Sequence, residues 1–252
     1  MNNLILDYEQ VMEKLNEIKR QGKNIKEQEI LGETKYGLPI RHFLCGRGKR
    51  HIVITGAAHG SEIITTDFVL RLMQQIQKDG QDINMNDYTL HFIPILNPEG
   101  YLISTSAVRK IIPREMNLEE AEKICKEYYK AYKQDDAEAQ KRRDEGLEPD
   151  RKTMKHHQEM FRNVDYTEIP AKYNDLRENI RKLYESGNIP NGTMQVWSAN
   201  GDGIDIQANS KYNRNLDRIE NGEKIYLERR YSNIISSMPG PLNCPYDVKK
   251  RI

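Results

Sequence analysis

The sequence predicts an α/β fold: a mixed, mostly parallel sheet flanked by helices, with a helical insertion. Three observations lead to this prediction. Residues 52–54 form a short β-branched apolar run, which predicts a buried strand. Residues 88–96 form a second apolar strand, closed by a turn at Asn97–Tyr101. Between the two strands, Val69, Leu70, Met73 and Ile76 recur at helical spacing, and strands that alternate with helices favour an α/β sheet.

The N-terminal part of the chain predicts an amphipathic helix over residues 7–21. Asp7 can cap this helix, with Gln10 at the third helical position, and Gly22 ends it. Its apolar face is formed by Val11, Leu15 and Ile18.

Residues 29–45 predict a hairpin, because two extended runs flank a Tyr36–Gly37 turn. His42 and His91 fall inside strand-like runs. We expect both to be packed, hydrogen-bonded histidines and not metal ligands.

The corner after the first apolar strand carries the candidate metal ligands His59 and Glu62. Gly56 and Gly60 mark a turn there, and Ser61 is a plausible N-cap, so Glu62 falls in the first turn of the next helix. In open α/β sheets ligands bind at such carboxyl ends of strands. An imidazole and a carboxylate at this place make half of a zinc site. The alternative is a helix-capping carboxylate beside an incidental histidine.

A second His-x-x-Glu, formed by His156 and Glu159, lies in a highly charged helical stretch with no strand before it. There we expect a solvated helix face. In a less favoured alternative, His156 or His157 completes the metal site from the insertion.

Composition limits the function classes. A chain of 252 residues most simply forms one domain, and a net charge of +1 gives no argument for a nucleic-acid or membrane partner. The three cysteines are widely spaced and odd in number, which indicates reduced thiols. No apolar run approaches the roughly 20 residues of a membrane span. No signal peptide is visible, so we expect a cytoplasmic protein, although a secreted chain trimmed of its signal would look the same.

Four short motifs, in this order, resemble those of the M14 (carboxypeptidase A-like) zinc carboxypeptidases. Residues 31–40 resemble their G-x-S-x-x-G-R-P-I hairpin, residues 56–62 their G-x-H-A-R-E metal motif, residues 97–101 N-P-D-G-Y, and residues 197–206 W-[KR]-x-N-x-x-G-V-D-L. The resemblance implies a zinc carboxypeptidase (phosphorylase/hydrolase-like) fold, one zinc ion and a peptide substrate.

The resemblance implies metal-assisted hydrolysis, in which zinc held by two His and one Glu activates water. His59 and Glu62 match the first two ligands. Ser198 stands where the family has its oxyanion-stabilising arginine, and Gln207 and Ala208 stand where it has the Asn-Arg carboxylate clamp.

The family's third zinc ligand and its general-base glutamate have no counterpart here, since no histidine follows His157 and the sequence ends at Ile252. We therefore expect residues 1–252 to form a single, incomplete domain that binds zinc weakly or not at all and is inactive as a peptidase. Such a chain is either a fragment or a degenerate relative.

Residues 114–190 are expected to be a helical insertion. Asn117 with Glu120 predicts a capped start, and Gly187 a stop. Between these two positions lie two apolar stripes. One is formed by Leu118, Ala121, Ile124, Cys125, Tyr128 and Tyr132, and the other by Tyr173, Leu176, Ile180, Leu183 and Tyr184. We expect packing on the rim of the sheet; the alternative is a lid or partner-binding element.

The segment after the last motif offers Gln207, Asn209 and Arg214, either as a surface loop or as a polar site for substrate. Family relatives that cleave γ-D-glutamyl-diaminopimelate bonds also depart from the Asn-Arg pattern, which suggests cell-wall stem peptides. Two other functions stay open: a non-catalytic peptide- or glycan-binding module, and an aspartoacylase-type zinc deacylase. A truncated sheet would also leave an open edge, so we expect a homodimer through that edge or its burial by the insertion.

Overall fold

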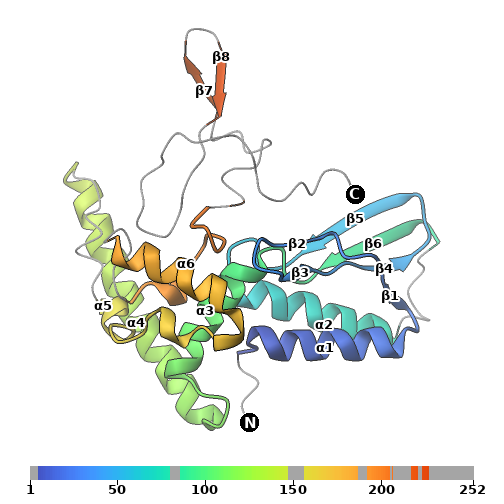
Figure 1. Cartoon of the computed structure of the whole chain (residues 1–252), viewed down its shortest axis with the longest axis horizontal. Coiled ribbons are helices and arrows are strands. Elements are labelled where there is room, and N and C mark those ends of the chain that lie inside the picture. The colour runs from blue at the N-terminus through green and yellow to red at the C-terminus, as the bar shows by residue number, and fades with distance from the viewer. Residues whose placement is uncertain are drawn as a thin grey trace.

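The computed structural model describes residues 5–79, 86–146, 156–186, 192–204, 206, 217–220 and 223–226; for residues 79, 157, 217–220 and 223–226 only the backbone is described. A sheet lies over two long helices, and a group of further helices stands beside them (Figure 1). Among the described helices, none combines the length and the apolar character that crossing a membrane requires.

The main sheet has four strands in the order β1 (Ile25–Glu27), β4 (Phe43–Gly46), β6 (Tyr88–Ile93) and β5 (Arg50–Thr55). The predicted mixed α/β sheet flanked by helices is confirmed. In the described sheet, however, only β5 and β6 are parallel, whereas β1–β4 and β4–β6 are antiparallel, so "mostly parallel" does not fit these strands. The reason is connectivity: only the β5–β6 connection carries the helix that a parallel crossover needs.

Helices α1 (Tyr8–Gln21) and α2 (Ile63–Asp79) pack beneath the sheet (Figure 1). The predicted capping box is confirmed, because Asp7 Oδ1 accepts from the Gln10 amide while Gln10 Oε1 accepts from the Asp7 amide, each at 3.1 Å. Gly22 ends α1 with a left-handed φ of 53°. The apolar face predicted for α1 is buried against α2 and the sheet as part of the main core.

The predicted hairpin is confirmed in β2 (Gly32–Glu33) and β3 (Pro39–Ile40), with Gly37 at φ 75° in the turn. Leu31 and Ile40 pack on Ile93 in a second, smaller apolar cluster.

Strand β5 corrects one prediction. Residues 52–54 do form a strand, but they do not form a buried one: Ile52 is 43% and Val53 46% exposed, and only Ile54 packs against the main core. The sequence-based prediction assumed a strand covered on both sides. In the described sheet β5 is an edge strand, so its outer side has no neighbouring strand. That residues 114–190 bury this edge, the alternative to a homodimer, stays a prediction.

The remaining elements follow the sheet. Asn97 caps α3 (Pro98–Ile111) by accepting from the Gly100 amide, and α4 (Leu118–Asp144) is capped by Asn117 as predicted. Further elements are α5 (His156–Glu159), α6 (Asn174–Glu185), the 3-10 turns η2 (Tyr166–Glu168), η3 (Ala171–Tyr173) and η4 (Met194–Val196), and the strand pair β7 (Asp217–Glu220) and β8 (Glu223–Tyr226).

Both apolar stripes predicted for residues 114–190 lie on helices. In α6, Leu176 and Ile180 are fully buried. In α4, Ala121 is buried, but Leu118 is 52% and Tyr132 42% exposed, so the stripe packs through its middle only. That these residues form an insertion stays a prediction, and Gly187 lies outside the described residues.

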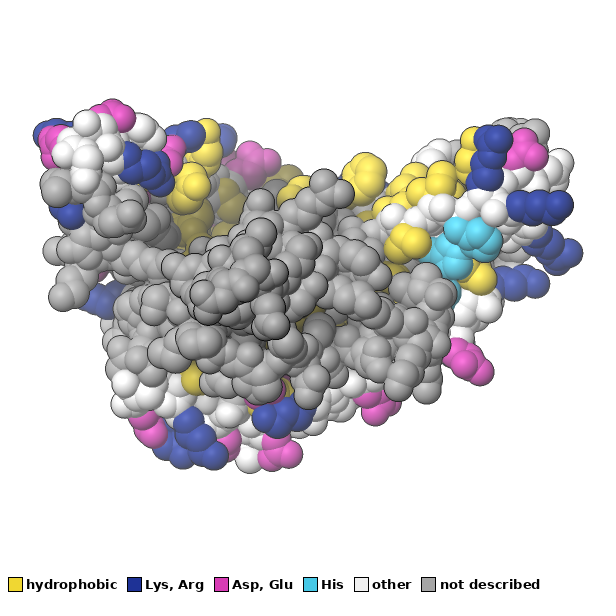
Figure 2. Space-filling model, turned by 90° about the horizontal axis from the view of Figure 1, so that it is seen from above, with side chains coloured by type: hydrophobic (Ala, Val, Ile, Leu, Met, Phe, Trp, Pro, Cys, Tyr) yellow, Lys and Arg dark blue, Asp and Glu magenta, His cyan; other side chains and the backbone are white. Residues whose placement is uncertain are grey.

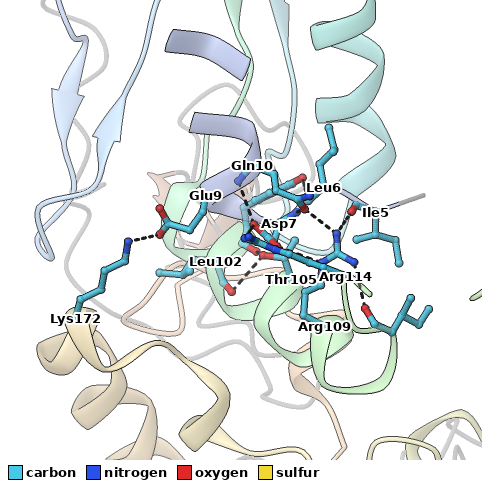
Figure 3. A network of polar contacts seen from close by, with 12 residues as sticks. Ile5, Leu6, Asp7, Glu9, Gln10, Leu102, Thr105, Arg109, Arg114 and Lys172 are labelled. Atoms are coloured by element: carbon cyan, nitrogen blue, oxygen red, sulfur yellow. Dashed lines mark hydrogen bonds and ion pairs between the residues drawn. The ribbon is translucent and has the colours of Figure 1, made fainter. Parts of the chain in front are cut away.

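An ion-pair network ties the start of α1 to the end of α3 (Figure 3). Asp7 accepts from Arg109 Nε at 3.2 Å and from both Nε and Nη2 of Arg114 at 2.7 Å. Burial alone would raise the pKa of Asp7, but hydrogen bonds from Arg114 and the Gln10 amide hold that pKa below its ordinary value.

Candidate metal centre

The candidate centre lies where the parallel strands β5 and β6 end at the same edge of the sheet. The backbone of the turn after β5 is fastened to the segment after β6: Leu96 N donates to Gly56 O at 2.8 Å and Asn97 N to Ala57 O at 2.9 Å. Ala57 has a φ of 44°, an uncommon value for a residue with a side chain. The Ala57 amide is held by Thr65 Oγ1 at 2.8 Å, so α2 fixes this strained position.

Two glycines allow the close approach of backbone segments at this corner. A Cβ on Gly60 would lie 2.0 Å from the carbonyl carbon of Gly100, and one on Gly56 would lie 2.4 Å from the Pro94 oxygen. The backbone of the turn between β5 and α2 therefore lies in close contact with the first turn of α3, which limits how far the turn can move.

His59 and Glu62 are placed side by side on this turn. His59 Nδ1 lies 3.0 Å from Glu62 Oε1, and the side chains are 24% and 46% exposed. Helix α2 begins at Ile63, so Glu62 precedes the helix instead of lying in its first turn. Ser61 lies two positions before the helix and so does not occupy its N-cap position. The Ser61 amide donates to Trp197 O at 2.9 Å, and Thr65 Oγ1 donates to the Glu62 carbonyl.

The segments that resemble family motifs converge around this turn. Asn97 Nδ2 donates to the carbonyl of Ala199 at 3.0 Å, and Ser104 Oγ donates to the carbonyl of Trp197 at 3.2 Å. Trp197 is 1% exposed and donates to Asn200 O. Three segments far apart in the sequence thus share one hydrogen-bonded unit.

The hairpin joins the same unit through residues that the sequence analysis did not single out. Tyr36 Oη donates to Asp202 Oδ1 at 2.8 Å, Lys35 Nζ pairs with the same oxygen at 2.8 Å, and Glu99 Oε2 accepts from the Gly201 amide at 2.7 Å. Tyr36 and Asp202 are more than 160 residues apart, so no local pattern predicts their hydrogen bond. The place of Tyr36 in the hairpin turn is the one feature of the sequence that draws attention to it.

The second His-x-x-Glu is used differently. The backbone amide of His156 donates to Asp135 Oδ1, and the ring nitrogen Nδ1 of His156 lies 2.8 Å from that same oxygen. Asp135 is fully buried. With Glu138, these residues form the one group of three potential metal ligands found among the described residues. The prediction that this helical stretch presents a solvated face is therefore only partly correct, because the His156 ring is hydrogen-bonded to Asp135 of α4. His156 does not join His59 and Glu62, and the side chain of His157 is not described.

His42 and His91 are hydrogen-bonded as predicted, with His42 Nε2 3.0 Å from His91 Nδ1. His51 joins them, with Nδ1 2.8 Å from His91 Nε2, and no local sequence pattern indicates this contact. Figure 2 shows histidine side chains at the surface beside hydrophobic ones. The pKa values of His42 and His91 are lowered, first by burial and then by the neighbouring histidine.

The predicted substrate-binding residues Gln207, Asn209 and Arg214 lie outside the described residues, so their role stays a prediction.

A family model described as zinc carboxypeptidase (M14) matches residues 11–167, more than half of the chain. The chain belongs to the zinc carboxypeptidase family. The matched range includes the hairpin, the His59–Glu62 turn and the Asn97–Tyr101 segment of this zinc carboxypeptidase relative. No curated protein matches the chain.

Three solved structures illustrate what this family member is similar to. Carboxypeptidase A from Helicoverpa armigera has a TM-score of 0.37 at 19% identity, with 40% of this chain and 26% of that chain covered. Bovine thrombin-activatable fibrinolysis inhibitor, in complex with a tick carboxypeptidase inhibitor, has a TM-score of 0.36 at 13% identity, with 38% and 32% covered. A metallo-carboxypeptidase from Burkholderia cenocepacia has a TM-score of 0.32 at 20% identity, with 36% and 27% covered. The chain thus spans less than a third of each of these proteins.

The pair on the turn is chemically suited to zinc, on which this family depends. His59 Nδ1 and Glu62 Oε1 are hydrogen-bond partners at 3.0 Å, and two ligand atoms about 2 Å from a tetrahedral zinc would be roughly 3.3 Å apart, so only a small shift would let both bind one ion. Within the described part of the chain, no third His, Cys, Asp or Glu completes a group with them.

Proposed function

We propose that His59 and Glu62 are two protein ligands of a zinc site in a peptidase-type hydrolase. The observation that carries the proposal is their 3.0 Å approach at the end of two parallel strands, on a turn to which the other family segments are hydrogen-bonded. Bound zinc would polarise a carbonyl and lower the pKa of its water. The chain's own part is to hold an imidazole and a carboxylate, both partly exposed, on a rigid turn.

We expect the 252-residue chain to bind zinc weakly and to hydrolyse no peptide on its own. Catalytic zinc sites usually have three protein ligands and one water, and only two ligands are identified here. Ser198, in place of the arginine of the family motif, also removes a charge that would stabilise an oxyanion. The second candidate, a non-catalytic peptide- or glycan-binding module, is favoured by Ser198 and Ala208, which stand where the family motifs have arginines.

A peptide is the proposed substrate or ligand, and cell-wall stem peptides are the proposed class. Support comes from the sequence, where Gln207 and Ala208 replace the Asn-Arg pair that grips a terminal carboxylate in the family. The cytoplasmic location likewise stays a prediction.

Metal titration of four purified proteins, the unmodified chain and three variants, tests the zinc site. Calorimetry with zinc should give one site in the unmodified chain, and a loss of at least tenfold in affinity in His59→Ala and Glu62→Gln. Asp135→Asn is the matched control, because it removes a carboxylate from the other potential metal group. Zinc binding that survives both corner variants but disappears in Asp135→Asn would overturn the assignment.

Hydrolysis assays separate the candidate functions. Peptide hydrolysis by the chain would contradict the expected inactivity. Release of acetate or succinate from N-acyl amino acids would favour a deacylase. Binding of a stem peptide without hydrolysis would favour the binding module.

A further inference from the structure

A mostly apolar cavity of about 340 Å³ lies behind the metal-binding turn. Ser61 and Ile63, the two neighbours of Glu62, line one side of it. Helix α4 closes another side with Ile124, Cys125 and Tyr128, from the middle of its apolar stripe. The cavity is therefore built jointly by the family turn and by the helix expected to belong to the insertion.

The lining combines aliphatic and aromatic side chains. Tyr128 and Phe161 meet edge to face, with ring centroids 5.8 Å apart and planes at 84°. Ile112 and Phe161 are 3% and 5% exposed, so these walls are part of the packed interior. Engineered apolar cavities of about 150 Å³ bind benzene, so this volume is sufficient for a molecule of one or two rings.

Gln195 brings a polar side chain to the cavity, where its amide is a side-chain hydrogen-bond neighbour of the Tyr128 hydroxyl. Gln195 is 6% exposed and lines the cavity. Its side-chain oxygen Oε1 is buried and has no hydrogen-bond partner among the described residues. The amide orientation is fixed, because Nε2 donates to Gly192 O at 2.8 Å and only the NH₂ end can donate to a carbonyl. A buried acceptor without a donor is costly, which favours a ligand that brings one.

We propose that this cavity binds a small aromatic molecule with a single hydrogen-bond donor, which reaches Gln195 Oε1 while its rings pack between Tyr128, Phe161 and the isoleucines. Ligand sites of this kind are mainly apolar, with few polar groups that fix orientation. The site does not use His59 or Glu62, so it exists whether or not zinc binds.

Indole and benzofuran test the proposal, because they have nearly the same shape but only indole carries an N–H donor. In calorimetry, indole should bind at one saturable site and benzofuran about tenfold more weakly. Ile124→Phe should abolish the binding of both by filling the cavity. Leu118→Phe is the matched control on the same helix, because Leu118 is 52% exposed and is not among the residues that line the cavity. This variant should bind indole as tightly as the unmodified chain.

Cys125 provides a second readout that needs no change to the cavity wall. In a chain with Cys244→Ser, a maleimide should label Cys125, which is partly exposed, in preference to the buried Cys45. Saturating indole should slow that labelling at least fivefold. The proposal fails if indole shows no saturable binding, if indole and benzofuran bind equally, or if indole leaves the labelling rate unchanged. Equal binding of the two would indicate that a water molecule, and not the ligand, donates to Gln195 Oε1.

Discussion

Asp7 and Arg114 form a bidentate ion pair, with Nε and Nη2 of the arginine each 2.7 Å from a different carboxylate oxygen. Asp7 also caps α1 and accepts from Arg109, whose side chain is 11% exposed. One carboxylate thus joins the start of the first helix to the end of α3 and the segment after it (Figure 3).

Asp7→Asn should lower the free energy of unfolding by about 3 kcal/mol, because it leaves Arg109 buried without its counter-charge while keeping a capping oxygen. Denaturant unfolding measures this. Asp67→Asn is the control: its i,i+4 pair with Arg71, which is 70% exposed, should contribute only about 0.3 kcal/mol. Equal losses in the two variants would contradict the role of Asp7.

The same carboxylate predicts a pH dependence. Its folded pKa lies below its ordinary value of 3.8, so the stabilisation is present above that pH and is lost as the pH falls below it. The acid limb of the stability curve should therefore be shallower in Asp7→Asn than in the unmodified chain.

The histidine chain on the sheet predicts a second, separate pH effect. The folded pKa values of His42 and His91 lie below their ordinary value of 6.5, so the unfolded chain takes up protons first as the pH falls. The free energy of unfolding should therefore decline as the pH drops below about 6.5. His91→Gln should flatten this decline, since it removes the central ring.

His51→Gln is the comparison for that experiment, because His51 is exposed and its removal leaves the His42–His91 hydrogen bond in place. It should retain most of the decline measured in the unmodified chain. A slope in His91→Gln that equals the unmodified slope would rule out the explanation.

Local signals in the sequence predicted the helices and the hairpin well. The Asp7–Gln10 box, the Asn117 cap and the turn at Gly37 each depend on residues within four positions of one another, so periodicity and capping chemistry suffice. The His59–Glu62 pair was predictable for the same reason, since three positions separate the two side chains.

Long-range relationships were not predictable from local patterns. Whether residues 52–54 are buried depends on which strands lie beside them, and the edge position of β5 leaves Ile52 and Val53 exposed. The addition of His51 to the histidine chain depends on strand register, and the Asp135–His156 contact depends on how α5 packs on α4. The proposed roles of Gln207, Asn209 and Arg214 stay predictions.

The outer edge of β5, which pairs with no strand among the described residues, predicts self-association of this chain. An antiparallel pairing of two copies, centred between Ile52 and Val53, would place Arg50 opposite Thr55 and leave no like charges facing each other. On helix α2, Ile64 is 73% and Phe68 62% exposed, which adds exposed apolar surface to this chain.

Light scattering over a concentration series should show a dimer that Val53→Lys converts to a monomer, because a charge on an edge strand opposes pairing. Leu118→Lys is the control, since Leu118 is similarly exposed but lies on α4, and it should leave the dimer intact. A chain that is monomeric at every concentration would exclude the homodimer.

Gly60→Ala should disrupt the turn that carries His59 and Glu62. A Cβ at this position would lie 2.0 Å from the carbonyl carbon of Gly100 and 2.2 Å from its oxygen, and both neighbours are backbone atoms that cannot rotate away. The turn or the first turn of α3 must then shift, so we expect a loss of about 3 kcal/mol in the free energy of unfolding, together with weaker zinc binding. Gly32→Ala is the matched control: nothing lies within 4 Å of its Cβ position, so the change should be neutral or slightly stabilising. Denaturant unfolding curves and zinc titrations of the two variants test this prediction. If Gly60→Ala is as stable as Gly32→Ala, the turn and α3 do not constrain each other through this backbone contact.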